Sequence, residues 1–268
     1  MKCRHCRASA SDVAHDGELT VSECRRVLDS LAAFRPMVIW TGGEPMTRED
    51  LPDLVAYATS LGIRSVLAPC GMYATEERLR ELKNAGVMAC SFSVDGADKA
   101  SHDAFRGMDG AWDCVFSAMS AARAADMPFQ VNTTVRKGSL DSLDAIYSIA
   151  MSEGAARLDL FFLVPTGRGR EIDSLVPDTA EIDAAIAWAE GKKTKLTCCP
   201  QAGTCIGGRG FAFLSHAGDL QTCGFVQTPC GNIRDAGFDF ARLVESAHNP
   251  LGVSGNCRIS PAASAAEN

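Results

Sequence analysis

The sequence has no basic cluster, no long apolar run and no internal repeat, and each absence narrows the classes of protein to consider. A formal net charge of -7 without a concentration of lysine and arginine argues against nucleic acid or an anionic membrane as the main partner. No apolar stretch approaches the ~20 residues of a membrane-spanning helix, and the N-terminus lacks the apolar core of a secretion signal. We therefore expect a cytoplasmic protein that acts on a small-molecule or protein substrate.

Cysteine is abundant, with twelve residues in a chain of 268. In the cytoplasm, reduced thiols more often bind metal or catalyse than form disulfides. Cys3 and Cys6 form one pair at the start of the chain. Six more cysteines crowd the last third: Cys198, Cys199, Cys205, Cys223, Cys230 and Cys257. The remaining four are dispersed, and apolar surroundings predict buried structural side chains for Cys24, Cys90 and Cys114.

Short apolar runs alternate with segments of helical spacing, which is typical of βα units around a parallel sheet. The predicted strands are 37–40, 64–68, 88–94, 129–135 and 158–164. The predicted helices are 22–34, 48–61, 75–85, 111–125, 140–153 and 179–190. The pattern changes after Thr166, so we expect a first domain over 1–190, a Cys-rich extension over 191–259 and a disordered tail over 260–268.

Two short motifs point to chemistry. The CxxC of "CRHC" alone fits a zinc half-site, a redox pair or cluster ligands, although no strand precedes it as thioredoxin chemistry requires. In "VIWTGGEP" an apolar strand runs into Gly42, Gly43 and Glu44. That places two glycines and a carboxylate at the carboxyl end of a parallel strand, where barrels bind ligands. An ordinary turn closed by glycine and proline is the alternative.

Together, "CRHC" and "GGEP" some forty residues later resemble the radical S-adenosylmethionine (radical SAM) superfamily. The resemblance implies a (β/α)6 barrel in which a CxxxCxxC loop holds a 4Fe-4S cluster and a Gly-Gly-Glu segment receives the methionyl amino group of S-adenosyl-L-methionine. Cys3 and Cys6 are then the second and third ligands, and the first is expected two residues upstream of Met1. We thus expect a partial barrel lacking its first strand and inactive as it stands.

The segment "SVDGADKASHDAFRG" strengthens the resemblance, since SxDG followed by HDxxRG is typical of the peptide- and porphyrin-modifying branch. It implies that Ser93 and Asp95 line the cofactor and that Arg106 meets the cofactor's carboxylate. Strand-end capping and a surface charge are the alternatives. Asn132 and Thr134 alternate toward one side of their strand and are expected to face the adenosine, although inward-packed polar residues would show the same pattern.

The segment "CIGGRGFAFLSHAGDLQTCGF" resembles the opening of the SPASM extension, in which cysteines hold an auxiliary iron–sulfur cluster. The resemblance implies a second 4Fe-4S cluster with Cys205, Cys223 and Cys257 as ligands. Ser260 stands where the partner of Cys257 is expected, so the extension is predicted to be incomplete.

Within this branch, "CRHCRASA", "FFLVPTGRG" and the extension are most similar to the heme synthases of the siroheme-dependent pathway and their relatives in heme d1 formation. This implies oxidative decarboxylation of porphyrin propionates, with an external electron donor and with Arg168 and Arg170 paired to substrate carboxylates. A solvated loop is the alternative for these arginines. Two other functions stay open: a radical SAM peptide maturase, and a non-catalytic protein that binds zinc through Cys3 and Cys6.

Overall fold

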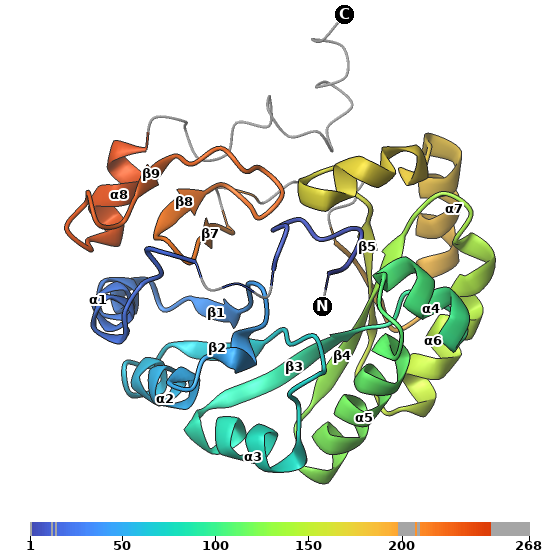
Figure 1. Ribbon diagram of the computed structural model, residues 1–268, viewed down its shortest axis with the longest axis horizontal. Helices are drawn as coiled ribbons and strands as arrows, with labels where there is room; N and C mark the ends of the chain where they lie inside the picture. Colours follow the sequence, from blue (N-terminus) through green and yellow to red (C-terminus); the bar gives the residue numbers. More distant parts are fainter. Residues whose placement is uncertain (1, 12, 14, 198–206, 208–209, 248–268) are drawn as a thin grey trace, which may run out of the picture.

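A parallel sheet of six strands, with neighbours in chain order, organises the protein. The computed structural model describes residues 2–11, 13, 15–197, 207 and 210–247. The strands of the sheet are β1 Met37–Trp40, β2 Arg64–Leu67, β3 Val87–Ser93, β4 Phe129–Val135, β5 Leu158–Phe162 and β6 Thr194–Thr197. They curve into an open arc with helices on its outer side, so the predicted half-barrel α/β fold is confirmed (Figure 1).

The α-helices are α1 Val21–Leu31, α2 Leu51–Ser60, α3 Glu76–Ala85, α4 Lys99–Arg106, α5 Ala111–Ala124, α6 Leu143–Ser152, α7 Thr179–Ala189 and α8 Phe240–Ser246. Short 3₁₀ helices cover Ala32–Phe34, Pro45–Thr47, Leu140–Ser142 and Gly167–Leu175. Several helices begin at the polar residue that the sequence offers for a cap. Thr20 and Glu23 form a reciprocal capping box on α1, and Asp178 and Glu181 form another on α7.

The five predicted strands are present, but β6 was not predicted. Its sequence, Thr-Lys-Leu-Thr, lacks an apolar run because β6 lies at an edge of the sheet and pairs only with β5 in the part of the chain described here. The sheet therefore continues to Thr197, past residue 190. The division of the chain into domains at residue 190 remains a prediction.

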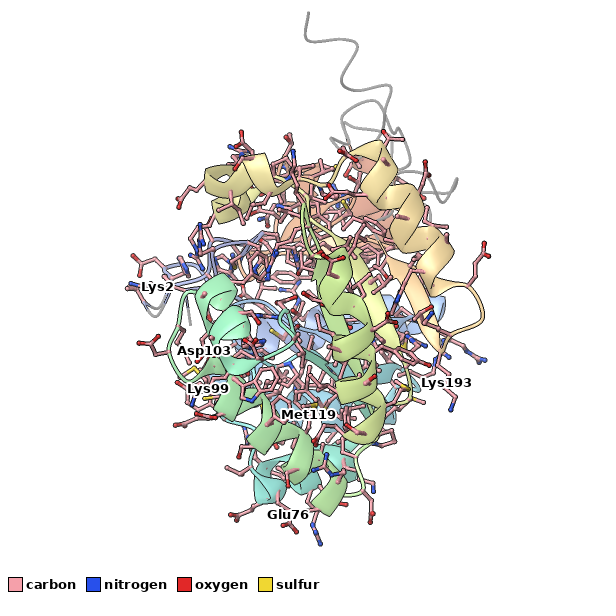
Figure 2. The ribbon with its side chains drawn as sticks, turned by 90° about the vertical axis from the view of Figure 1, so that its right-hand side faces the viewer. Lys2, Glu76, Lys99, Asp103, Met119 and Lys193 are labelled. Carbon is pink, nitrogen blue, oxygen red and sulfur yellow. The ribbon has the colours of Figure 1, made fainter. Side chains whose placement is uncertain are left out.

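The outer face of the sheet carries the main core. Phe92 of β3 and Val131 of β4 alternate with polar residues, and with Leu160 of β5 they are fully buried in the main core. Ala118, Met119 and Ala122 of α5 are fully buried in the same core. In Figure 2, Glu76 and Lys193 project from the periphery of the molecule.

The inner face of the arc is polar where β3, β4 and β5 meet. Ser91 and Ser93 of β3 stand in register with Gln130 and Asn132 of β4, and Asn132 stands in register with Asp159 of β5. Closed barrels fill this space with branched apolar side chains. A polar inner face, called the lumen face below, is instead the composition of a ligand-binding wall.

The first strand leaves apolar side chains uncovered. In the described residues β1 pairs only with β2, and Met37 and Ile39 are 51% and 42% exposed. The opposite face of β1 is covered, because Val38 and Trp40 pack against residues of α1 and α2.

The C-terminal extension is a small antiparallel sheet of β7 Phe213–Leu214, β8 Asp219–Gln221 and β9 Gly231–Asn232, followed by α8. It shares an apolar core with α1, built from Leu19, Val27, Leu220, Ile233 and Leu243. Within the described ranges, no helix combines the length and apolar character needed to cross a membrane.

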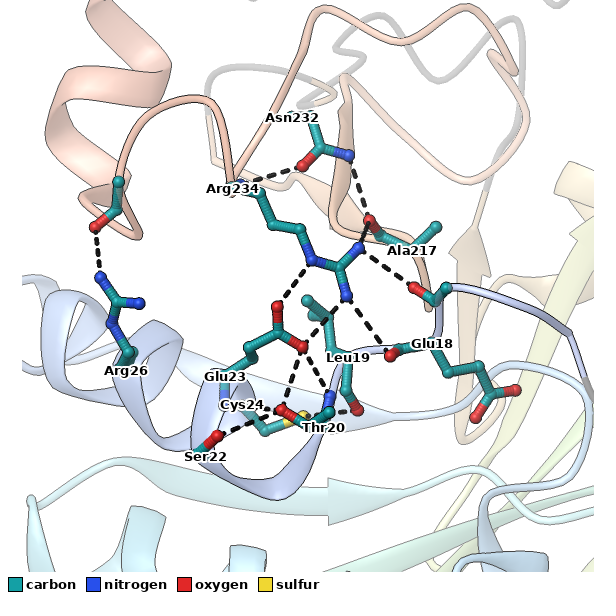
Figure 3. Close-up of polar contacts among 12 residues, drawn as sticks. Glu18, Leu19, Thr20, Ser22, Glu23, Cys24, Arg26, Ala217, Asn232 and Arg234 are labelled. Atoms are coloured by element: carbon teal, nitrogen blue, oxygen red, sulfur yellow. Dashed lines mark hydrogen bonds and ion pairs between the residues drawn. The ribbon is translucent and has the colours of Figure 1, made fainter.

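Arg234 fixes the extension to α1, as Figure 3 shows. Its guanidinium donates to both carboxylate oxygens of Glu23, at 2.7 and 3.0 Å, and to the carbonyl oxygens of Gly17 and Ala217. The hydrogen bonds from Arg234 lower the pKa of Glu23 to about 2. One side chain therefore joins the start of the chain to residues more than two hundred positions later.

Candidate active site

Cys3 and Cys6 lie on one turn of the N-terminal loop, residues 2–11. The Cys6 N–H donates to the Cys3 carbonyl at 3.2 Å, and the Ala10 N–H lies 3.4 Å from the Cys6 Sγ. Both cysteines are half-buried and free. The loop lies inside the arc of strands (Figure 1), where its contacts come from segments that follow the carboxyl ends of β1, β3 and β5.

The segment after β5 holds the N-terminal loop from one side. The Arg168 guanidinium donates through Nε to the Cys3 carbonyl at 2.9 Å and through Nη1 to the Ala10 carbonyl at 2.7 Å. The Arg168 N–H also donates to the Cys6 carbonyl at 3.1 Å. Arg168 was predicted to pair with substrate carboxylates, but two of its three guanidinium nitrogens donate to this loop, while Arg170 is exposed.

Gly167 makes this approach possible. Its φ is +56°, and a Cβ at this position would lie 2.4 Å from the carbonyl oxygens of Cys6 and Arg7. Both the conformation and the contact therefore require glycine. The sequence carried the signal in "TGRG", but nothing local indicates that this loop packs against residues near the N-terminus.

The Gly-Gly-Glu segment borders the same loop after β1. A Cβ on Gly43 would contact the Ala10 side chain at 3.6 Å, and Gly42 has a φ of +138°. The Glu44 carboxylate accepts the N–H of Met46 at 2.9 Å and that of Cys70 at 2.6 Å. Glu44 thus ties the ends of β1 and β2 together, and its predicted contact with the methionyl amino group stays a prediction.

Asp95, which follows β3, forms a buried ion pair with Arg106 of α4. The Asp95 Oδ2 lies 2.6 Å from the Arg106 Nη2, and the Asp95 Oδ1 accepts the Thr134 N–H at 2.7 Å. Burial opposes ionisation of Asp95, but the positive charge of Arg106, the neighbouring histidines and the hydrogen bond from the Thr134 N–H together outweigh it and lower the carboxyl pKa to about 2. Arg106 also places Nη1 3.7 Å from the Cys3 Sγ.

This pairing changes the predicted role of Arg106. The guanidinium is already bound to a carboxylate of the chain, so a cofactor carboxylate would have to share it. Its Nε is buried without a hydrogen-bond partner, which leaves one donor for such a group. Ser93 stands beside Asn132 in the register of β3 and β4, so these two predicted cofactor residues do lie together on the lumen face.

The Phe105 ring contacts both His5 and a further arginine, Arg136. The His5 ring stacks on Phe105 with centroids 4.6 Å apart, and the Arg136 guanidinium lies 4.4 Å from the centre of the same ring. The His5 Nε2 is 3.9 Å from the Asp95 Oδ2. Arg136 follows the end of β4 and its Nε is buried without a hydrogen-bond partner, yet no sequence motif marks this residue.

His102, which belongs to the HDxxRG motif, is a buried residue. The predicted set of helices did not include α4, on which His102 is 1% exposed. Its Nδ1 accepts the Asp95 N–H at 3.1 Å, and its ring meets the Trp112 ring edge-on. Burial, then the charge of Arg106, lowers the His102 pKa to about 4.

We expect this histidine to make stability depend on pH. In the unfolded chain His102 takes up a proton at its ordinary pKa of 6.5, whereas in the folded chain it stays neutral down to about 4. The unfolded state therefore binds more protons between these values, and stability falls as pH is lowered through that window.

Between pH 7 and pH 5, urea unfolding should show a loss about 1–2 kcal/mol larger for the natural chain than for His102→Gln. The glutamine can still accept the Asp95 N–H but does not titrate. Equal losses in both chains would exclude His102 as the source.

The extension reaches the N-terminal loop through Arg7. The Arg7 Nη1 donates to the Gly224 carbonyl at 3.2 Å, and the guanidinium lies 4.6 Å from the centre of the Phe213 ring. Cys223 is half-buried and Cys230 is buried. The predicted ligands Cys205 and Cys257 lie outside the described residues, so the auxiliary cluster stays a prediction.

Sequence comparisons agree with this arrangement. The profile of the Radical SAM superfamily matches residues 1–147. The AdoMet-dependent heme synthase of Nitratidesulfovibrio vulgaris is 36% identical over 271 residues, which cover 89% of this chain and 74% of that protein. The AdoMet-dependent heme synthase of Methanosarcina barkeri is 35% identical over 296 residues, which cover 97% of this chain and 84% of that protein.

Solved structures share the fold. The structure of anSMEcpe with bound AdoMet and the Kp18Cys peptide superposes with a TM-score of 0.72 at 16% identity, covering 91% of this chain and 76% of that one. SuiB of Streptococcus suis bound to S-adenosylmethionine gives 0.69 at 14% identity, covering 95% of this chain and 64% of that one. With the motifs, the half-barrel and the family match together, the chain belongs to the radical SAM superfamily and is a radical SAM enzyme, for which a 4Fe-4S cluster and S-adenosyl-L-methionine are the implied cofactors.

Proposed function

We propose that this enzyme removes carboxylate oxidatively from the propionate side chains of an iron porphyrin in heme formation. The observation that carries the proposal is the similarity to AdoMet-dependent heme synthases, which extends over 97% of the chain in one case. An Fe-coproporphyrin III synthase of Methanosarcina barkeri is also 33% identical over 64% of the chain. PqqA peptide cyclases are more distant, at 30% identity or below, so a peptide substrate has less support.

The described residues fit the cluster in part. Cys3 and Cys6 would hold it, although no group of three His, Cys, Asp or Glu side chains suited to a metal ion occurs in the part of the chain that the structure describes. The Nε of Arg106 and the Nη2 of Arg168 are buried without hydrogen-bond partners beside these cysteines, as befits the surroundings of an anionic group. When bound, the cluster and S-adenosyl-L-methionine supply a carbon-centred radical that abstracts hydrogen next to the porphyrin ring.

The protein's own part is to hold these groups in place. Arg168 and Gly167 fix the backbone of the N-terminal loop, and the Asp95–Arg106 pair sets a positive charge next to Cys3. Arg136 and Arg170 are the cations that we assign to substrate carboxylates. Both follow strands whose carboxyl ends face the N-terminal loop, an edge of the sheet that we call the mouth of the half-barrel. A reduced external electron donor is the further partner that we propose.

The test uses an extended chain, in which a cysteine stands two residues before Met1, the position that the CxxxCxxC spacing predicts for the first ligand. It is reconstituted anaerobically with iron and sulfide and incubated with S-adenosyl-L-methionine, a reductant and iron coproporphyrin. Mass spectrometry should show porphyrin products that have lost carboxylate. Conversion of a peptide substrate with no change in the porphyrin would contradict the proposal.

Arg136→Met should weaken binding of iron coproporphyrin by about tenfold or more, because a charge-assisted hydrogen bond to a propionate is lost. The change in the Soret absorbance on titration measures this affinity. Arg64→Met is the matched control, since exposed Arg64 begins β2 at the opposite end of the sheet. Equal effects of the two substitutions would remove Arg136 from the substrate site.

A further inference from the structure

A chain of hydrogen bonds crosses the lumen face below the mouth of the half-barrel. The Arg157 Nε donates to the Asp159 Oδ1 at 2.6 Å, and the Arg157 Nη2 donates to the Gln130 Oε1 at 2.6 Å. The Gln130 Nε2 in turn donates to the Asp159 Oδ2 at 2.8 Å and to the Asn132 Oδ1 at 3.0 Å. Asp159 is only 3% exposed, so this network is shielded from water at its centre.

The chemistry of these groups determines which atom donates and which accepts in each hydrogen bond. A guanidinium has donors only, so the Gln130 atom that faces Arg157 must be the amide oxygen. The Gln130 nitrogen then points at the Asp159 carboxylate and at Asn132, and the Asn132 atom that accepts from it must also be oxygen. The Asn132 Nδ2, with two N–H groups, is consequently left for the lumen.

The position of Asn132 indicates what it meets. The N-terminal loop, Gly43 and Arg106 gather at the mouth and suit the charged methionyl end of the cofactor. The uncharged nucleoside must then lie against uncharged polar side chains. Asn132 and its register neighbour Ser93 are such residues, and both are half-buried rather than sealed within the core.

We propose that Arg157, Asp159 and Gln130 are positioning residues that hold Asn132 as a hydrogen-bond donor for an oxygen or ring-nitrogen acceptor in the nucleoside of S-adenosyl-L-methionine. The inference rests on the cofactor used in the proposed function but not on the porphyrin. We call the hydrogen bonds that run from Arg157 and Asp159 through Gln130 to Asn132 the relay. Without the relay the Asn132 amide can turn over and present its oxygen, which repels an acceptor. Loss of one such hydrogen bond corresponds to about five- to tenfold weaker binding.

Two nearly isosteric substitutions test the direction of the relay. Asn132→Asp removes the donor, and Gln130→Glu removes the donation to the Asn132 Oδ1, so that the Asn132 amide turns its nitrogen toward residue 130. Thr133→Val is the control, because Thr133 adjoins Asn132 on β4 but lies on the opposite, helix-covered face of the strand, where it is 2% exposed. Circular dichroism and thermal unfolding establish that each chain is folded.

Calorimetric titration of the reconstituted extended chain with S-adenosyl-L-methionine, without porphyrin, gives the Kd. We expect Asn132→Asp and Gln130→Glu each to raise it about five- to tenfold and Thr133→Val to leave it within about twofold. In an Asn132→Ala background, Gln130→Glu should add nothing, since it acts through Asn132. Binding by Asn132→Asp as tight as that of the natural chain would overturn the proposal, and so would a full effect of Gln130→Glu in the Asn132→Ala background.

Discussion

Gly167→Ala should lower the amount of cluster that the extended chain holds by about tenfold or more while the half-barrel stays folded. The new Cβ would stand 2.4 Å from two backbone oxygens of the N-terminal loop, at a φ of +56° that alanine rarely adopts. The loop must move, and the two thiolates move with it. Iron and sulfide per chain after reconstitution measure the result, with circular dichroism as the check on folding.

Gly191→Ala is the matched control for this substitution. Gly191 also has a positive φ, +72°, but no atom lies within 4 Å of the position that a Cβ would take. It therefore carries the same conformational strain without touching the N-terminal loop. Equal iron contents in the two variants would show that the segment after β5 does not position the cluster ligands.

Asp95→Asn should destabilise the protein by about 3–5 kcal/mol, because it leaves the buried Arg106 charge without its carboxylate. The Asp95 side chain is 1% exposed and that of Arg106 is 11% exposed, so water cannot replace the lost partner. The asparagine still offers an oxygen to the Thr134 N–H, which isolates the effect of the charge. Equilibrium unfolding in guanidinium chloride at neutral pH measures the change.

The comparison is with Asp113→Asn, which breaks an ion pair of the same kind with Lys99 on the surface. There the side chains are 63% and 57% exposed, and the expected cost is about 0–1 kcal/mol. Combining Asp95→Asn with Arg106→Met should recover part of the loss, since no charge is then left buried. A cost at Asp95 no greater than that at Asp113 would mean that the pair contributes little to the fold.

The sequence predicted the partial barrel well where one face of each strand is buried under helices. Strands β3, β4 and β5 are continuous or alternating apolar runs because one face packs under the helices, and their bounds were predicted to within about two residues. Strand β6 was missed since an edge strand needs no apolar run. Helix α4 was missed because most of its short sequence is polar, and only its buried face, with His102 and Phe105, reveals what it packs against.

For the site, sequence reasoning identified residues that sit on motifs and missed those that act through distant contacts. Cys3, Gly43, Asp95 and Arg106 do come together at the mouth. The hold of Arg168 on the N-terminal loop joins residues 165 positions apart, and no local pattern encodes such a contact. The lumen relay is likewise visible only once β4 and β5 are in register.

The yield of 5'-deoxyadenosine after reduction of the anaerobically reconstituted extended chain measures directly whether the N-terminal loop holds a cluster that cleaves S-adenosyl-L-methionine. We expect iron-dependent formation of 5'-deoxyadenosine by the chain with natural Cys3 and Cys6, and its loss in Cys3→Ser and in Cys6→Ser. Tight binding of zinc, with no visible iron–sulfur absorbance and no 5'-deoxyadenosine, would contradict this expectation.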